Sequence, residues 1–501
     1  MNYYDFVYYL PMWIVVFPFV MTAVIFLVER KSRFGRNLLA IVTSTITFIM
    51  VAAMYPAIIN GEIIYYQLAN LVPPFGISFR VDTLGFGLSL LASFIWMLVT
   101  IYSLEYMKKE NYTGRYYPAL IMTLSGCMGL FLAGDLFTMF IFFELMSLVS
   151  YLLIIHNETK EALKAGYKYL MVTIIGGLFL FFGIIITFEL SQTITLNQMG
   201  IISEPSSLAF AGFLSFLIGF GMKAGMFPLH VWLPEAHPVA PSPASALLSG
   251  IMIKTGAYGL IRVIFHVFDY QMILEVNWHL ILAVVAVITI FLGSAVAITQ
   301  KNLKRRLAYS SIGQMGYILL GLAILTETAM IGDIFHIFSH AFMKSTLFLA
   351  AGAMIMKTGK KKIADLKGVG KQMPLTMLCF TIAALAMIGI PPLNGFISKW
   401  SLSLGALEAG QPYYVVVLLL SSLMNGVYYL PIINIAYFGS SDDSHEEEHE
   451  EKIAISEAPI KMLMPIVVLG FGCLLISLFP TNIPYELSRL AAETLINGAP
   501  F

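Results

Sequence analysis

Apolar runs long enough to cross a lipid bilayer recur along the whole chain and are separated by short polar segments. A bilayer-spanning helix needs about 20 consecutive apolar residues. The run from Pro118 to Ile155 is too long for one crossing at about 1.5 Å per residue, so we break it at Ala133–Asp135. The pattern then predicts fourteen spans, at 8–28, 38–59, 84–104, 118–134, 136–155, 168–189, 207–228, 244–268, 277–299, 312–327, 331–356, 375–403, 413–438 and 461–480.

The composition agrees with an all-α polytopic membrane protein. Hydrophobic residues make up 58% of the chain and charged residues 12%, against roughly 25% charged residues in soluble proteins. The formal net charge of zero disfavours a nucleic-acid partner. Cys127, Cys379 and Cys473 lie singly in apolar runs, without a CxxC pair. We therefore expect no thiolate metal site and no cofactor on this chain.

The basic residues predict the orientation of these spans. With the N-terminus outside, most of the 29 lysine and arginine residues fall in cytoplasmic loops, whereas Arg80 and Arg489 lie outside and Arg262 lies near the outer end of the eighth span. This asymmetry follows the positive-inside rule. It predicts a multi-pass protein of the cytoplasmic membrane with both termini outside.

Four lysines, Lys223, Lys254, Lys344 and Lys399, remain inside predicted spans. A charge in this position costs about 2.5–3.5 kcal/mol on insertion scales. A single lysine near a helix end can extend to the interface, but four together favour a functional row. Glu144, in the middle of the fifth span, is the acidic counterpart, and we expect it to be protonated or paired with a lysine of another span. A purely structural ion pair is the alternative.

His336, His340 and Lys344 are spaced i, i+4 and i+8, which places them on one helix face. A metal site would need at least one more close ligand such as Cys, Asp or Glu, and we predict no metal site here. Imidazole and amine groups suit a hydrated, proton-exchanging row better. The His445–His449 pattern "HEEEH" matches a zinc-protease motif, but it lies in a short acidic loop, where a solvated charge run is the expected interpretation.

Proline interrupts two of the spans that carry lysines. Pro228 follows Lys223 in the seventh span, and Pro391 and Pro392 precede Lys399 in the twelfth. Interrupted spans in two halves of a transporter are typical of inverted repeats with an ion path at mid-membrane. We therefore predict repeats over spans 4–8 and 9–13, and a division into 1–117, 118–268, 269–438 and 439–501. His230 and His237, beyond the first break, are further candidates.

Several stretches resemble one family, the antiporter-like membrane subunits of respiratory complex I, Mrp-type Na⁺/H⁺ antiporters and membrane-bound hydrogenases. They are "FFELMSLVSYLL", "KAGMFPLHVWLPEAHPVAPSPASALLSGIMIKTGAYGLIR", "QKNLKRRLAYSSIGQMGYI", "HAFMKSTLFLAAG" and "GIPPLNGFISKW". The resemblance implies that Glu144 pairs with Lys223 and that Lys254 bridges to a central relay. That relay would be His336, His340 and Lys344, and Lys399 would end the path.

The resemblance implies proton movement, with possible Na⁺/H⁺ exchange, by one subunit of a larger membrane complex. The host is either an Mrp antiporter, of which the chain is similar in size to the D-type component, or a proton-pumping redox complex of hydrogenase or complex I type. Two rivals are a quinone oxidoreductase in its own right and a stand-alone solute carrier. The sequence shows no cofactor ligands for the first, and the second leaves the lysine row unexplained.

Overall fold

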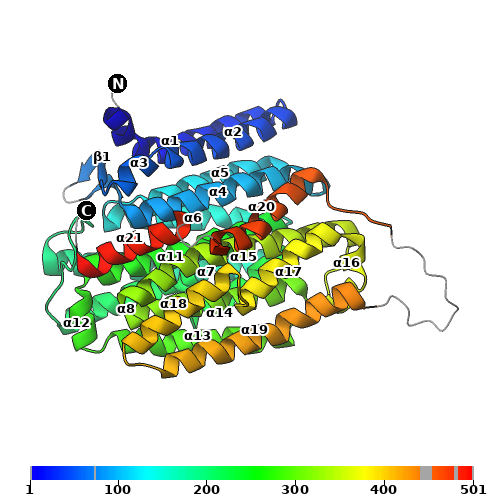
Figure 1. The fold of residues 1–501 in the computed structure, drawn as a ribbon. Helices are drawn as coiled ribbons and strands as arrows, with labels where there is room; N and C mark the ends of the chain where they lie inside the picture. Colours follow the sequence, from blue (N-terminus) through cyan, green and yellow to red (C-terminus); the bar gives the residue numbers. More distant parts are fainter. Residues whose placement is uncertain (1–2, 73–74, 440–453, 479–482, 499–501) are drawn as a thin grey trace.

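The computed structural model describes residues 3–72, 75–439, 454–478 and 483–498, and it forms one bundle of long helices (Figure 1). The "HEEEH" motif lies outside the described residues. The N-terminal part contains α1 (Tyr3–Glu29), α2 (Arg33–Ala52), α3 (Tyr55–Ile59), β1 (Ile64–Val72), β2 (Phe75–Val81), α4 (Thr83–Tyr106) and η1 (Met107–Lys109). The next helices are α5 (Thr113–Phe131), α6 (Leu136–Ile154), α7 (Lys160–Ser191) and α8 (Ser207–Ala224).

The second half of the chain adds the central and C-terminal helices. First come η2 (Leu229–Trp232), α9 (Leu233–Val239), α10 (Ser242–Leu247), η3 (Leu248–Met252), α11 (Ile253–Arg262), η4 (Val263–Val267) and α12 (Tyr270–Glu275). Next are α13 (His279–Thr299), α14 (Leu303–Ile324), α15 (Glu327–Thr358), η5 (Ile363–Leu366) and α16 (Val369–Gln372). The last are α17 (Pro374–Ile388), α18 (Asn394–Glu408), α19 (Tyr413–Phe438), α20 (Ile460–Leu478) and α21 (Ile483–Asn497).

Twelve segments of the described residues are long and apolar enough to cross a membrane, against the fourteen predicted spans. The two predicted spans without a counterpart among these twelve are α5 and the α17–α18 pair. In the second case the break between Ile388 and Asn394 leaves two helices of 15 residues each, and each is too short to cross alone.

Side chains at the ends of the helices explain where the long apolar stretch 118–155 is divided. Asp135 precedes α6, and its carboxylate accepts hydrogen bonds from the backbone N–H of Thr138 at 2.7 Å and from the hydroxyl groups of Thr138 and Ser78. An aspartate at this N-cap position satisfies backbone donors that the first helical turn leaves free. The predicted break at Ala133–Asp135 is confirmed.

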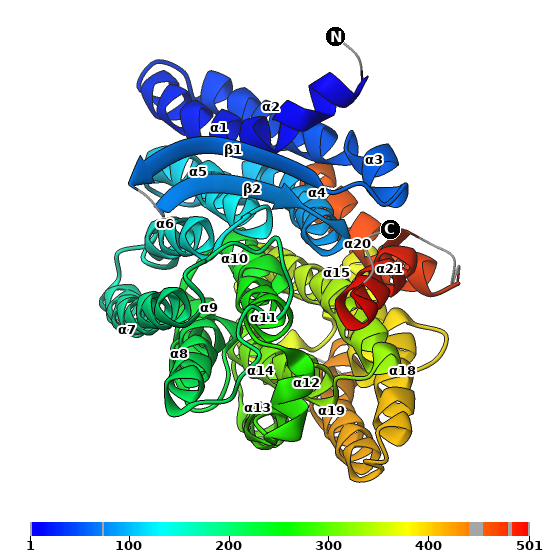
Figure 2. The same cartoon turned by 90° about the vertical axis from the view of Figure 1, so that its left-hand side faces the viewer.

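The all-α prediction was wrong in one detail, because β1 and β2 form an antiparallel hairpin in which Ile64 pairs with Val81. Figure 2 looks onto the end of the bundle where this hairpin lies, in contact with α1 and α6. We call it the hairpin end, and both described chain ends lie there (Figure 1). The amphipathic helix α21, which no predicted span covers, packs against α15 and α4.

Three helices occupy the middle of the bundle, α11, α14 and α15 (Figure 2). Their membrane-spanning windows are between 94% and 100% buried inside the chain, whereas those of α1 and α19 are about one third buried. A helix that is covered on all sides can hold polar groups that never meet lipid. The candidate residues of α11 and α15 therefore lie in the protein interior.

Candidate functional site

The four lysines predicted to lie inside spans are all buried in the structure. Lys223 and Lys344 have no exposed surface, Lys254 is 1% exposed and Lys399 is 7% exposed. They come from four different helices, α8, α11, α15 and α18. None extends to the surface of the chain, so their ammonium groups depend on partners inside the protein.

Lys223 lies in the last turn of α8, where the helix ends before the proline break. Its Nζ donates hydrogen bonds to the hydroxyl of Tyr169 on α7 at 2.7 Å and to Ser147 Oγ on α6 at 3.1 Å. Nζ also lies 5.0 Å from the centre of the Tyr169 ring, within the range of a cation–π contact. These groups replace part of the hydration shell that the ammonium loses on burial.

The structure does not contain the predicted contact between Glu144 and Lys223. No salt bridge within 4.0 Å joins Glu144 to any described residue, and its buried Oε1 atom has no hydrogen-bond partner. Glu144 and Lys223 still interact electrostatically. The Glu144 side chain lies against Gly177 of α7, where a Cβ would come within 2.1 Å of Oε1. A small residue at position 177 therefore makes room for the carboxyl group.

Lys254 follows a π-helical turn, η3, that the sequence did not reveal. Its Nζ donates to the backbone carbonyl of Ser249 at 2.5 Å. In a π-turn the backbone bonding shifts to i→i+5, and such turns are frequent at functional sites. Ser249 Oγ is in turn 2.7 Å from Ser311 Oγ of α14. Hydrogen-bonding groups thus connect Lys254 to the neighbouring central helix.

Lys344 is held by the same region of α14. Its Nζ donates to the carbonyl oxygen of Leu307 at 3.0 Å, to Ser310 Oγ, and to the hydroxyl of Tyr429 on α19 at 3.3 Å. Ser310 directly precedes Ser311, whose hydroxyl group is hydrogen-bonded to Ser249, the partner of Lys254. Lys254 and Lys344 interact electrostatically, so the charge on one affects the other.

His336 and His340 lie on the same face of α15 as Lys344, as predicted. Their rings are stacked, with centroids 5.9 Å apart and planes 4° from parallel. His336 Nδ1 is 2.8 Å from Ser398 Oγ of α18, whereas both ring nitrogens of the buried His340 lack a hydrogen-bond partner among the described residues. No group of three or more potential metal ligands occurs in the described part of the chain.

Lys399 lies beyond the break between α17 and α18, and it binds the helix end that this break exposes. Its Nζ donates to the carbonyl oxygens of Met387 and Ile388, each at 2.9 Å, and to Ser422 Oγ of α19 at 3.0 Å. The last carbonyls of a helix lack partners and carry partial negative charge, which stabilises a cation. Ile388 and Ser422 also line a groove of about 960 Å³ at the surface of the chain.

The two further histidine candidates have surroundings of a different kind. His237 of α9 is fully buried and stacks on Phe348 of α15, with centroids 4.6 Å apart, and neither of its ring nitrogens has a hydrogen-bond partner among the described residues. His230 lies in η2 and is 9% exposed, close to Phe227. Neither histidine forms a hydrogen bond to one of the four lysines in the described structure, so neither is joined directly to the row.

Sequence reasoning missed the hydroxyl groups that link the row. Ser147, Tyr169 and Tyr429 all accept a hydrogen bond from a buried lysine, yet serine and tyrosine are common in apolar spans. Ser147 lies one helical turn after Glu144, and this i+3 spacing is the one signal that pointed to it. Ser310 and Ser422 accept from Lys344 and Lys399 in the same way, and the other partners are backbone carbonyls, which no residue pattern identifies.

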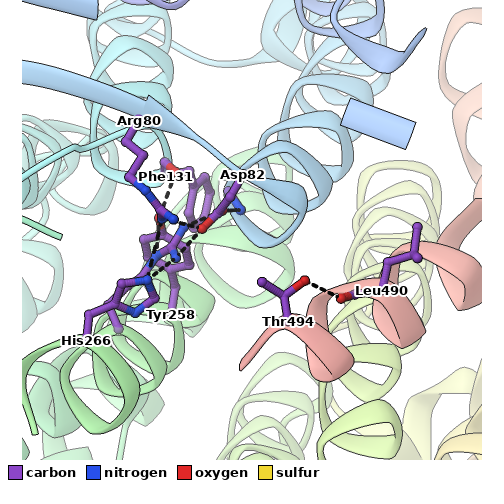
Figure 3. A network of polar contacts seen from close by, with 9 residues as sticks. Arg80, Asp82, Phe131, Tyr258, His266, Leu490 and Thr494 are labelled. Carbon is purple, nitrogen blue, oxygen red and sulfur yellow. Dashed lines mark hydrogen bonds and ion pairs between the residues drawn. The ribbon is translucent and has the colours of Figure 1, made fainter. Parts of the chain in front are cut away.

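A second buried network, near the hairpin end, was also missed (Figure 3). Asp82 caps α4, and its two carboxylate oxygens accept hydrogen bonds from Arg262 at 2.6 Å each; Oδ2 also accepts one from Arg80 at 2.6 Å. His266 Nε2 lies 3.3–3.4 Å from both guanidinium groups. Burial alone would raise the pKa of Asp82, but Arg262 and Arg80 bring it well below its usual value, so the carboxylate stays charged.

This network predicts a large loss of stability when its acidic member is removed. We expect Asp82→Asn to lower the stability by about 3–5 kcal/mol, because two buried guanidinium groups lose their counter-charge while the side-chain cap is kept. The midpoint of thermal unfolding in detergent measures this effect. Arg489→Gln is the matched control, since its ion pairs with Glu486 and Glu493 are half-exposed and such pairs contribute about 0–1 kcal/mol. Equal midpoints for both variants would contradict the prediction.

Family models match two stretches of this chain. Residues 133–425 match the model described as "NADH:quinone oxidoreductase/Mrp antiporter, TM", and residues 73–117 match "NADH-Ubiquinone oxidoreductase (complex I), chain 5 N-terminus". The first match covers more than half of the chain and includes the residues from Glu144 to Lys399. The chain belongs to this family of antiporter-like membrane subunits.

Relatives of this antiporter-like subunit come from three types of complex. It is 33% identical to the N-type subunit of the NADH-quinone oxidoreductase of Desulforudis audaxviator, over 95% of this chain and 97% of the relative. It is 32% identical to the D-type component of a Na⁺/H⁺ antiporter of Alkalihalophilus pseudofirmus, over 82% and 84%. It is 31% identical to hydrogenase-4 component B of Escherichia coli, over 85% and 66%. The family therefore includes subunits of all three types of complex.

Solved structures share the fold of this subunit. A chain of the Mrp complex from Dietzia sp. DQ12-45-1b matches with a TM-score of 0.87 and 23% identity, over 99% of this chain and 98% of the other. A chain of an archaeal membrane-bound sulfane sulfur reductase matches with a TM-score of 0.87 and 24% identity, over 97% of each. Both belong to multisubunit membrane complexes, and both confirm a polytopic helical membrane fold.

Proposed function

We propose that this subunit moves protons along the buried row that runs from Glu144 and Lys223 through Lys254 and the relay of His336, His340 and Lys344 to Lys399. The single observation that carries the proposal is that each of the four buried ammonium groups is held by hydroxyl groups or backbone carbonyls, without a carboxylate partner within salt-bridge distance among the described residues. A lysine fixed permanently in an ion pair would not release its proton. These lysines keep their hydroxyl and carbonyl partners when they release a proton.

Coupling between neighbouring sites would drive the transfer when two of their charges come close together. Two unit charges 4 Å apart interact with about 4 kcal/mol at an effective dielectric constant of 20, which corresponds to about three pKa units. A change in the separation of Glu144 and Lys223 would therefore alter the proton affinity of Lys254, and so on along the row. The structure holds Glu144 and Lys223 apart, which would be the open state of this switch.

The geometry supports a finer architecture, which belongs to the same proposal. The chain would cross the membrane fourteen times, with α5 and the α17–α18 pair as the two additional crossings. Spans 4–8 and 9–13 would be inverted repeats, because the interrupted segments α8–α9 and α17–α18 each place a lysine next to a helix break. The hairpin end would face outward, with both termini, in the cytoplasmic membrane.

The host complex and the second ion belong to the proposal as well. We propose other membrane subunits of an Mrp, hydrogenase or complex I type assembly as partners, and Na⁺ as the second candidate ion. Redox chemistry, where the host performs any, would lie on partner subunits. Co-purification of nickel and iron–sulfur subunits would assign the hydrogenase type, and co-purification of small antiporter subunits would assign the Mrp type. A stand-alone solute carrier would transport without any partner.

The test removes the central amine of the row in the assembled complex. In Lys254→Met, which keeps the chain length of the side chain, we expect proton movement to fall by about tenfold or more, because a proton-transfer step loses its carrier. Fluorescence quenching of a pH-sensitive dye in membrane vesicles measures the transport. The exposed Lys371→Met is the control, and unchanged transport in Lys254→Met at normal subunit levels would refute the proposal.

A further inference from the structure

One buried acidic residue of the central helix α15 has no place in the row described above. Asp333 has no exposed surface, and both of its carboxylate oxygens lack a hydrogen-bond partner among the described residues. Aspartate is almost never fully buried without a partner. In the sequence it lies three residues before His336, in a segment where only the two histidines and Lys344 were predicted as site residues.

Asp333 lies where three helices meet. A Cβ on Gly321 of α14 would come within 2.8 Å of Asp333 Cβ and 3.0 Å of Cγ, and within 2.7 Å of a Leu402 methyl group on α18. The Asp333 carboxyl group therefore occupies space that the absence of a side chain at position 321 leaves open. The junction of α14, α15 and α18 is built around this acid.

The same three helices hold His336 one turn further along. His336 is hydrogen-bonded to Ser398 of α18, and its ring packs edge-on against Tyr317 of α14 with centroids 5.6 Å apart. Gly321 lies four residues after Tyr317, and Leu402 lies four residues after Ser398. Each step is about one helical turn. Asp333 is thus one turn from His336, on the side of the hairpin end, where Glu327 begins α15 and Asn497 contacts it.

Structural roles for Asp333 do not fit its surroundings. It is the seventh residue of α15, and the helix dipole acts within the first turn only. It forms no ion pair and no capping bond with the described residues, and no group of metal ligands includes it among them. An ionised carboxylate without partners is strongly disfavoured in such a site. The remaining state is a neutral acid whose proton has no acceptor in the described part of the chain.

We propose that Asp333 is a proton-exchanging residue of the row, which carries protons between His336 and the hairpin end of the subunit. The inference rests on the proposed function. The proton passes through water from the carboxyl group to the free imidazole nitrogen, so that the acid becomes a carboxylate and His336 an imidazolium, and return of a proton from the hairpin end restores the acid. His336 Nε2, which has no hydrogen-bond partner in the described part of the chain, is the nitrogen available for this exchange.

Two nearly isosteric substitutions test this role. Asp333→Asn keeps the shape and polarity of the side chain but has no proton to exchange at neutral pH. Asp333→Leu has a similar branched shape and removes the unsatisfied polar group, a change that leaves folding intact. We expect each variant to lower proton movement in vesicles by at least about fivefold, with normal amounts of assembled complex. Loss of the infrared band of a protonated carboxyl group in Asp333→Asn is the second expected result.

The controls separate this inference from the proposed function. Glu327→Gln changes a carboxyl group at the start of the same helix and should leave transport unchanged. Normal transport in Asp333→Asn beside lost transport in Lys254→Met would overturn the inference alone, whereas normal transport in both would refute the proposed function. Lost transport in Asp333→Leu with normal transport in Asp333→Asn would show that the site needs polarity and not proton exchange, which also overturns the inference.

Discussion

Replacing Lys399 by alanine is expected to reduce proton transport by about 100-fold, because the amine next to the α17–α18 break is the last proton carrier of the row. Lys399→Arg is expected to fail as well, since a guanidinium group keeps its charge but does not release its proton in the working pH range. Lys399→Glu is expected to retain part of the activity, because a carboxyl group also exchanges protons. All three variants are compared in one vesicle assay.

The arginine variant decides between two roles of Lys399. The Nζ atom donates to the carbonyls of Met387 and Ile388 at the end of α17, so a fixed positive charge that stabilises this helix end is the structural alternative. Lys399→Arg preserves that stabilising charge. Wild-type transport in Lys399→Arg would therefore identify an electrostatic support and would move the end of the path elsewhere. Lys371→Ala, an exposed lysine shortly before α17, controls for a general loss of positive charge.

Glu144→Gln and Lys223→Met are each expected to remove most transport, by about 100-fold, while the complex still assembles. The pair is separated in the structure, with Lys223 bound to Ser147 and Tyr169 instead. A switch that alternates between a separated and a paired state needs both charges, so loss of either one has the full effect. Vesicle transport and subunit levels are measured together.

The double variant gives the sharper result. If Glu144 and Lys223 act as one unit, Glu144→Gln combined with Lys223→Met should transport no less than either single variant, because coupled residues are not additive. Fully additive losses would show two independent contributions and would contradict the switch. The exposed pair Glu161 and Lys164 on α7, replaced by glutamine and methionine, provides the matched control.

The hydrophobic pattern determined most of the helix arrangement along the chain. A continuous apolar run has one stable outcome in a bilayer, because a helix satisfies every backbone group internally. The breaks at Pro228 and Pro391–Pro392 were predictable as well, because proline removes a backbone donor that a continuous helix needs. The hairpin of β1 and β2 and the helix α21 were not predictable. They lie at the end of the bundle, where the apolar pattern stops and pairing with distant segments decides the structure.

The sequence by itself indicated that the charged groups inside apolar runs are buried, because such a run offers a lysine or glutamate no contact with water. It located Glu144, Lys223, Lys254, Lys344 and Lys399 without any coordinates. Only the tertiary structure decided what each of them contacts. The partners are backbone carbonyls of α14, of a π-turn and of the end of α17, and hydroxyl groups on other helices. The same holds for the hydrogen bonds of the Asp82 network and for the unpartnered position of Asp333, since both depend on packing between helices that no local residue pattern encodes.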